Sequence, residues 1–269
     1  MRRLLLLVLM LSSLLLARND VPSCYDALKI DSPHGTADKE LFILIDQTTI
    51  IDRNMMKYTY QNMMNFMKNG SAVTVASFSS NSNGKYTDLV YSGKLERLLP
   101  KKEQYNISKK TLRKYEGCMT GQSKFAKKKA KKALGRVLKG ASKKLPHSDI
   151  IKSLENISKN IIAPSTSKEK IVLLVSDMIE HSSITSFYSK GSLKFVNTKK
   201  ELSKVLANKS FGNFAGAKVY VIGTGILAKK GYRDAKTLTA LSNFWKAYFK
   251  ASKANLQEMG TPMLLGDVR

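Results

Sequence analysis

The sequence predicts an α/β protein with three layers, in which a mostly parallel central sheet is covered by helices on both faces. Two unbroken apolar runs, "LFILID" (residues 41–46) and "IVLLVS" (171–176), are typical of strands that are buried on both sides. Strand-like and helix-like segments alternate along the chain, which is typical of βαβ units. At 269 residues and 43% hydrophobic composition, the chain can bury a substantial core in one domain with terminal extensions.

The amino terminus predicts export. A basic "MRR" precedes a run of fourteen mostly apolar residues that ends at Ala17, too short for a comfortable membrane span and typical of a secretory signal peptide over residues 1–17. The alternative is a signal anchor that is not cleaved. We therefore expect a periplasmic or extracellular protein, membrane-anchored if the apolar run is retained, with residues 18–40 as a connector to the domain.

The elements of the domain, predicted over residues 41–255 with a tail at 256–269, follow in order. Strands are expected at 41–46, 71–78, 171–176 and 217–223, with a weaker one at 87–92. A first helix covers 54–70, with Gly70 as its C-cap. A second covers 148–162, with Ser148 as its N-cap. A third, over 236–254, is expected to bury Leu238, Leu241, Phe244, Trp245 and Phe249.

A lysine-rich insertion is expected at about 101–146. Residues 101–144 contain sixteen Lys or Arg and only two acids, within a chain of net charge +26. The pattern predicts an amphipathic helix with a narrow apolar stripe and a broad lysine face. That face is either a solvated surface or a docking patch for an anionic partner, such as anionic lipid, lipopolysaccharide or nucleic acid. The candidate polyanion-binding residues are Lys127, Lys128, Lys129, Lys131 and Lys132.

Two cysteines, Cys24 and Cys118, are the only pair available for a disulfide, which an oxidising compartment would permit. Two buried free thiols are the alternative. With three scattered histidines besides (His34, His147 and His181), the sequence has no zinc-cluster spacing. A metal, if bound, must be held by oxygen ligands.

Oxygen-bearing side chains follow two of the predicted strands. The carboxyl ends of parallel strands meet at one edge of a sheet, where α/β proteins bind their ligands. The residues that we expect there are Asp46, Thr48 and Thr49 after the first strand, Asp177, Glu180 and His181 after "IVLLVS", and Ser148 from the preceding helix start. Two carboxylates and several hydroxyls at this edge suit a hard cation such as Mg²⁺, Ca²⁺ or Mn²⁺.

This layout resembles a von Willebrand factor A domain, which has a Rossmann-like topology. Members of that family open on an apolar strand ending in Asp-x-Ser-x-Ser, the first part of a metal-ion-dependent adhesion site. "DQTTI" matches with Asp46 and Thr48, Ser148 stands at the family's Thr, and Asp177 in "VSDM" at its later Asp. The resemblance, over about residues 40–255, implies that these four residues hold the cation, with Asp177 acting through water, and that a partner carboxylate completes the site.

The chain departs from the family pattern at two positions. Ile50 replaces the second Ser of the first motif and cannot ligate a metal, and Met178 replaces the usual Gly after Asp177. The sequence therefore leaves open whether the site binds a cation or is a relic. In either case it predicts a non-enzymatic module that binds a protein partner, with Thr49, Glu180 and His181 as further candidate contacts.

Other motifs predict less. Gly223, Gly225 and Ala228 have G-x-G-x-x-A spacing, but they follow the last major strand, and no predicted strand that ends in an acid lies about twenty residues later. We therefore expect a tight turn and no nucleotide cofactor. No constellation supplies both an activated nucleophile and a base, so we expect no enzyme activity. The alternative function is a polyanion-binding protein that acts through its lysine-rich helix.

Overall fold

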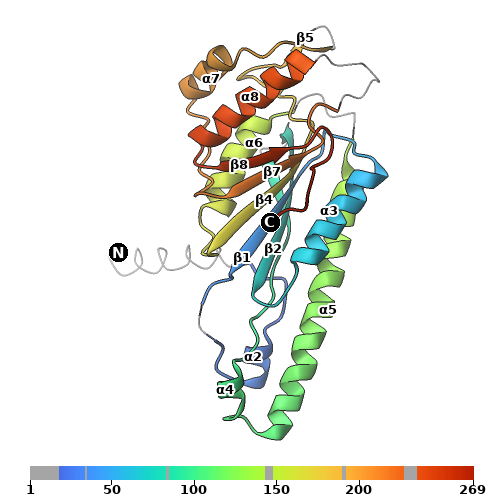
Figure 1. The fold of residues 1–269 in the computed structure, drawn as a ribbon, viewed down its shortest axis with the longest axis vertical. Coiled ribbons are helices and arrows are strands. Elements are labelled where there is room, and N and C mark those ends of the chain that lie inside the picture. The colour runs from blue at the N-terminus through green and yellow to red at the C-terminus, as the bar shows by residue number, and fades with distance from the viewer. Residues whose placement is uncertain (1–17, 34, 83–84, 143–147, 190–191, 227–234) are drawn as a thin grey trace, which may run out of the picture.

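The computed structural model describes residues 18–33, 35–82, 85–142, 148–189, 192–226 and 235–269 (Figure 1). Its centre is a six-stranded sheet in the order β3-β2-β1-β4-β7-β8, in which all neighbours are parallel except the β2–β3 pair. The predicted fold class is confirmed. The strands are β1 (Lys39–Asp46), β2 (Ser71–Ser82), β3 (Lys85–Lys94), β4 (Glu169–Val175), β7 (Lys218–Ile222) and β8 (Asn255–Met259).

The five predicted strands are all present, and the sequence analysis missed β8 at one edge of the sheet. A separate short hairpin joins β5 (Tyr188–Ser189) to β6 (Ser192–Leu193). The helices are α2 (Cys24–Leu28), α3 (Arg53–Phe66), α4 (Lys101–Gln104), α5 (Lys109–Gly140), α6 (Ile150–Ile157), α7 (Thr198–Ala207) and α8 (Ala235–Ala251). A π-helical turn, Ser158–Ile162, continues α6.

The helices cover the two faces of the sheet (Figure 1). Side chains of β1 alternate between the faces, as strand geometry requires. Leu41, Ile43 and Ile45 belong to the core that includes residues of α3 and α5. Phe42 and Leu44 belong to the second core, which includes residues of α6 and α8. The central strands are therefore buried on both sides, which explains why β1 and β4 read as unbroken apolar runs.

Helix α5 spans 32 residues and begins where the Ser108 hydroxyl accepts a hydrogen bond from the Thr111 N–H. Its predicted apolar stripe is buried at Ala126, Ala130, Leu134, Val137 and Leu138, whereas Ala133 and Ala141 are half-buried. Helices α3 and α5 approach closely at Gly135, where a Cβ atom would lie 2.5 Å from the Tyr60 hydroxyl. The amphipathic character expected of this segment is confirmed.

Three details of the predicted helices are corrected. Helix α3 ends at Phe66, and Gly70, with φ +83°, instead forms the turn into β2. Helix α6 begins after Asp149, which is its N-cap, whereas the backbone of Ser148 pairs with His181 and its hydroxyl donates to Asp46. In α8, Leu238 is half-buried, while the other four predicted core residues of that helix are buried.

A small third cluster lies below the amino end of the sheet, where α2 and α4 meet the first turns of α5 (Figure 1). The predicted disulfide is present there, with the Cα atoms of Cys24 and Cys118 5.8 Å apart. The Tyr25 hydroxyl donates to the Arg97 carbonyl at 2.7 Å, and the Tyr115 hydroxyl accepts from the Leu99 N–H at 2.7 Å. The connector is thus fastened to the amino-terminal turns of α5.

The segment after β8 also packs on the domain: the Val268 N–H donates to Asn62 Oδ1 at 2.9 Å, and the Tyr220 hydroxyl donates to the Arg269 carbonyl. The expected division into leader, connector, domain and tail stays a prediction. The leader over residues 1–17, His34 and His147 lie outside the described residues. None of the helices in the described ranges combines the length and apolar character that a membrane span needs.

Candidate functional site

The order of strands brings the predicted site residues to the carboxyl ends of β1 and β4. These two strands are neighbours, and the chain continues from β1 to β2 on one side and from β4 to β7 on the other. In open α/β sheets, ligands bind where the strand order reverses in this way. Asp46 is the last residue of β1, and Ser176 and Asp177 directly follow β4.

A buried carboxylate surrounded by hydroxyl groups occupies this point. Asp46 is fully buried. Its Oδ1 accepts hydrogen bonds from the Thr48 N–H at 2.8 Å and the Thr48 hydroxyl at 2.5 Å. Its Oδ2 accepts from the hydroxyls of Ser176 at 2.7 Å, Thr49 at 3.2 Å and Ser148 at 3.4 Å. Burial raises the pKa of Asp46, and the hydrogen bonds from Thr48 and Ser176 oppose that shift.

Ser148 reaches Asp46 from the segment before α6. Its backbone N–H and carbonyl both pair with His181, at 3.2 and 2.9 Å, which fixes the serine above the end of the sheet. The Thr48 and Ser148 hydroxyl oxygens lie 3.0 Å apart. Three of the four predicted metal ligands, Asp46, Thr48 and Ser148, are therefore in direct contact.

The fourth predicted ligand, Asp177, is joined to Asp46 through Thr49. The Thr49 hydroxyl donates to Asp46 and accepts from the Asp177 N–H at 3.1 Å. The Asp177 carboxylate accepts from the Ile179 N–H at 2.9 Å, which orients the side chain within its own turn. Thr49 thus holds the ends of β1 and β4 together from inside the protein.

Met178 keeps the backbone conformation that a glycine would adopt. Its φ is +61°, in the left-handed region that costs a non-glycine residue about 1–2 kcal/mol. The side chain is fully buried. Its N–H donates to the Ser176 hydroxyl at 3.0 Å, and its carbonyl accepts from Trp245 Nε1 at 2.8 Å. The departure from the family pattern at this position changes the side chain and keeps the turn.

Glu180 lies behind the site as a second fully buried acid. Its Oε2 accepts from the Ile151 N–H at 2.9 Å at the start of α6, where the helix dipole favours negative charge. Its Oε1 is buried and has no hydrogen-bond partner among the described residues. Burial raises the pKa of Glu180 to about 8. In the folded protein the Glu180 side chain therefore stays mostly protonated at neutral pH and does not act as a fully ionised helix cap.

The three predicted partner contacts differ in accessibility. Thr49 and Glu180 are buried, so a partner would reach them only after a rearrangement of the loops. His181 is partly exposed, and its Nδ1 lies 2.8 Å from the Ser186 hydroxyl. Its ring packs edge-on against Tyr188. Of these three residues, His181 is the one whose exposed surface a partner could contact directly.

Sequence reasoning gave no role at the site to Ser176 and Gln47. Ser176 donates the shortest bond to Asp46 Oδ2, and a hydroxyl directly before Asp177 at a strand end was the available signal. Gln47 fastens the site loop to the end of α5, since its Nε2 donates to the Val137 carbonyl at 3.1 Å and its own carbonyl accepts from the Ser142 N–H. The carboxyl end of α5 therefore lies beside the site.

The residues present fit a hard divalent cation. Carboxylate and hydroxyl oxygens are its preferred ligands, and a hydroxyl that donates its proton to Asp46 keeps lone pairs for a metal. The described residues contain no group of three or more His, Cys, Asp or Glu that could hold a metal, so a cation here would depend on Thr48 and Ser148. Ile50 is 45% exposed and supplies no oxygen at the position where the family has a second serine.

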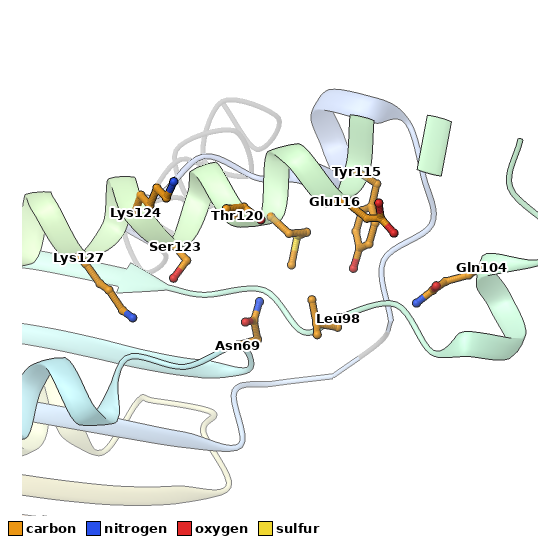
Figure 2. Close-up of a pocket in the computed structure, with 10 residues that line it drawn as sticks. Asn69, Leu98, Gln104, Tyr115, Glu116, Thr120, Ser123, Lys124 and Lys127 are labelled. Atoms are coloured by element: carbon orange, nitrogen blue, oxygen red, sulfur yellow. The ribbon is translucent and has the colours of Figure 1, made fainter. Parts of the chain in front are cut away.

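The predicted polyanion-binding residues lie on α5. Lys128, Lys129, Lys131 and Lys132 are exposed, and the Lys129 ammonium lies 5.4 Å from the centroid of the Phe125 ring. Lys127 is half-buried and lines a pocket of about 540 Å³ near the amino end of the helix (Figure 2). The pocket is also lined by Asn69, Leu98, Gln104, Tyr115, Glu116, Met119, Thr120, Ser123 and Lys124.

The glycine motif after β7 forms a turn. Gly223 and Gly225 have φ values of +93° and +74°, and a Cβ on Gly223 would lie 3.1 Å from the Ser176 carbonyl oxygen. The Gly225 N–H donates to the Asp177 carbonyl at 2.8 Å. Glycine is therefore required for the conformation and for the close approach to β4. Ala228 lies outside the described residues.

Comparison with known proteins gives the following results. No family model and no curated protein sequence matches the chain. Among solved structures, the chain is similar to the pilus adhesin SpaC from Lactobacillus rhamnosus GG, with 11% identity over 85% of this chain and 29% of SpaC at a TM-score of 0.40. It is also similar to BatB from Bacteroides thetaiotaomicron, with 11% identity over 84% of this chain and 92% of BatB at a TM-score of 0.37.

A third similar structure is an aerotolerance-related membrane protein from Bacteroides fragilis, with 12% identity over 84% of this chain and 92% of that one at a TM-score of 0.36. Such low identities and TM-scores carry no argument about activity. The fold class stands on the chain's own strand order, and membership of the von Willebrand factor A family stays a prediction.

Proposed function

We propose that this protein is an exported, non-enzymatic module of the von Willebrand factor A type, which binds a protein partner at the carboxyl edge of its sheet with the help of a divalent cation. The observation that carries the proposal is the buried Asp46 carboxylate with its four hydroxyl donors at the point where the strand order reverses. Export is supported by the apolar leader and the disulfide.

The chain's own residues supply the framework of such a site. The hydroxyl oxygens of the half-buried Thr48 and the buried Ser148 lie 3.0 Å apart beside Asp46, while the hydroxyls of Thr49 and Ser176 donate to Asp46 Oδ2. When bound, a divalent cation would neutralise Asp46 and offer an open coordination position to a carboxylate of the partner. The partly exposed His181, whose backbone holds Ser148, is then the nearest candidate for a direct partner contact.

A non-enzymatic role is supported by the environment of the nearest hydroxyl–imidazole pair. Ser186 lies 2.8 Å from His181 Nδ1, but its hydroxyl also accepts from the Tyr188 N–H at 3.1 Å and donates to the Tyr188 carbonyl at 3.3 Å. These bonds close a local turn and leave Ser186 poorly placed as a nucleophile.

Thermal unfolding with Mg²⁺ and with chelator tests the metal part of the proposal. A cation at 100 times its Kd adds about 2.7 kcal/mol, which raises the Tm of a chain of this size by roughly 5–10 °C. Asp46→Ala should abolish that increase. Asp31→Ala removes an exposed acid far from the site and should retain it. Equal Tm values of the unmutated protein in Mg²⁺, in Ca²⁺ and in chelator would refute the cation.

A further inference from the structure

We propose that helix α5 docks this protein on the surface of an anionic lipid bilayer, independently of the site at the carboxyl edge of the sheet. The docking residues are Lys124, Lys128, Lys131, Lys132 and Lys139, which we call the lysine face. They are all exposed, and their spacing in steps of three, four and seven or eight residues puts them on one side of the helix.

The positive charge on α5 is not compensated by ion pairs among the described residues. The helix contains twelve Lys or Arg and a single acid, Glu116. None of these cations forms an ion pair with another residue in the described ranges, whereas several lysines elsewhere do, for example Lys204 with Glu201 and Lys218 with Glu169. Over 32 residues the helix extends about 48 Å, and it runs along one side of the molecule (Figure 1).

The composition of the face favours a fluid, diffuse layer of negative charge. Ten of the twelve cations are lysines, whose hydrated point charges suit mobile headgroups, whereas arginine suits fixed bidentate recognition. The apolar stripe of α5 is buried against the sheet and is not available to a bilayer. The contribution of the helix itself is therefore electrostatic. For lysines near an anionic leaflet it amounts to about fivefold in partitioning for each lysine that reaches the surface.

An exposed apolar side chain beside Lys124, and a second one before the amino end of α5, favour lipid over single-stranded nucleic acid. Leu98 is 58% exposed and Tyr105, between α4 and α5, is 87% exposed. Leu98 and Met119 line the same pocket as Lys124 (Figure 2). An apolar surface beside cations matches a phospholipid, whose phosphate lies above its acyl chains. Single-stranded nucleic acid needs rows of aromatic platforms. On this helix Phe125 is 38% exposed and lies under Lys129.

Vesicle sedimentation of the full chain at 0.15 M salt, in chelator, tests the proposal. The measured quantity is the ratio of the partition constants on vesicles of phosphatidylcholine with 30% phosphatidylglycerol (about a physiological share) and on pure phosphatidylcholine. The ratio cancels whatever the apolar leader contributes. Replacing all five residues of the lysine face by Gln should lower it about 100-fold, if three of the five reach the surface. Asp46→Ala should leave it unchanged.

Two further variants make the test specific. Lys199, Lys200, Lys236, Lys246 and Lys250, all exposed and on α7 or α8, are replaced by Gln to give the same change in net charge, and this control should keep the ratio within about threefold. The double variant Leu98→Ser with Tyr105→Ser should weaken vesicle binding but leave binding to a short DNA duplex unchanged.

Three outcomes would overturn the proposal. One is equal loss in both five-lysine variants, which would mean that net charge and not the lysine face is responsible. Another is an unchanged ratio of partition constants in the lysine-face variant, provided that thermal unfolding followed by Trp245 fluorescence shows the variant to be as stable as the unmutated protein. The third is tighter binding of the DNA duplex than of the anionic vesicles at the same salt, which would assign α5 to nucleic acid.

Discussion

Glu180 should make the stability of this protein depend on pH in a direction opposite to that of an ordinary surface acid. Its pKa is raised by burial from 4.5 to about 8. Between these two pH values the folded protein keeps a proton that the unfolded chain releases, so stability falls as pH rises through this window and the loss levels off above pH 8. Linkage gives a loss of about 3 kcal/mol between pH 5 and pH 8.

The variant Glu180→Gln isolates this effect, because its side chain is neutral at every pH. Its amide oxygen can still accept from the Ile151 N–H. The difference in unfolding free energy between the variant and the unmutated protein should therefore rise by about 3 kcal/mol from pH 5 to pH 8. Urea denaturation measures it, with the single tryptophan, the buried Trp245, as the fluorescence probe.

Glu155→Gln is the matched control, an acid on α6, the helix whose first turn donates to Glu180. Burial tends to raise the pKa of Glu155, but hydrogen bonds from Lys159 and Lys152 outweigh it and lower the pKa below 4.5. Glu155 is then largely ionised in both the folded and the unfolded protein from pH 5 to pH 8. The difference in unfolding free energy between Glu155→Gln and the unmutated protein should therefore stay constant over this range. If the difference in unfolding free energy for Glu180→Gln is also constant from pH 5 to pH 8, the claim that the folded protein keeps Glu180 protonated is refuted.

Three further variants test the backbone and the cross-links. Because Met178 has a positive φ, Met178→Gly should be more stable than Met178→Ala by about 1 kcal/mol, the reverse of the usual order, as measured by urea unfolding. The double variant Cys24→Ser with Cys118→Ser opens a 94-residue separation and should lose about 3–5 kcal/mol; equal stability with and without reductant in the unmutated protein would contradict this. Thr49→Val removes the hydroxyl that joins the two strand ends and should cost about 2–3 kcal/mol, with Thr49→Ser restoring most of it.

The buried parts of the fold could be predicted because their sequence signals are local. The apolar runs of β1 and β4 identify the central strands, and Asp46 and Asp177 follow directly from where those runs end. Strand β8 could not be found in the same way: "NLQEM" lies at the sheet edge, is only partly buried, and reads as polar. Edge strands lack the two-sided burial that makes a strand visible in sequence.

Ser148 shows why the site itself was harder to predict. A serine before a helical stretch favours an N-cap, and the prediction of Ser148 as a helix cap rests on that local preference. The hydroxyl instead donates to the buried Asp46 carboxylate, 102 residues away in the sequence, which needs hydrogen-bond donors because it is removed from water. Ser176 was missed for the same reason, since its partner is also Asp46. An N-cap hydroxyl accepts from its own helix and can be predicted locally, whereas the acceptor that a hydroxyl finds for its proton depends on tertiary structure.

The disulfide also determines how the protein carries mechanical tension. A pull on residue 18 detaches the few hydrogen bonds of the connector to β3 and then reaches Cys24, where the covalent bond passes the force to Cys118 in α5. The strands β1, β2 and β3 lie between the two cysteines and cannot be drawn out, which hides about 320 Å of chain from extension. Asp46 is inside this protected loop, whereas Ser148 and Asp177 lie outside it, so tension would part the two halves of the site before it unravelled the strand that holds Asp46.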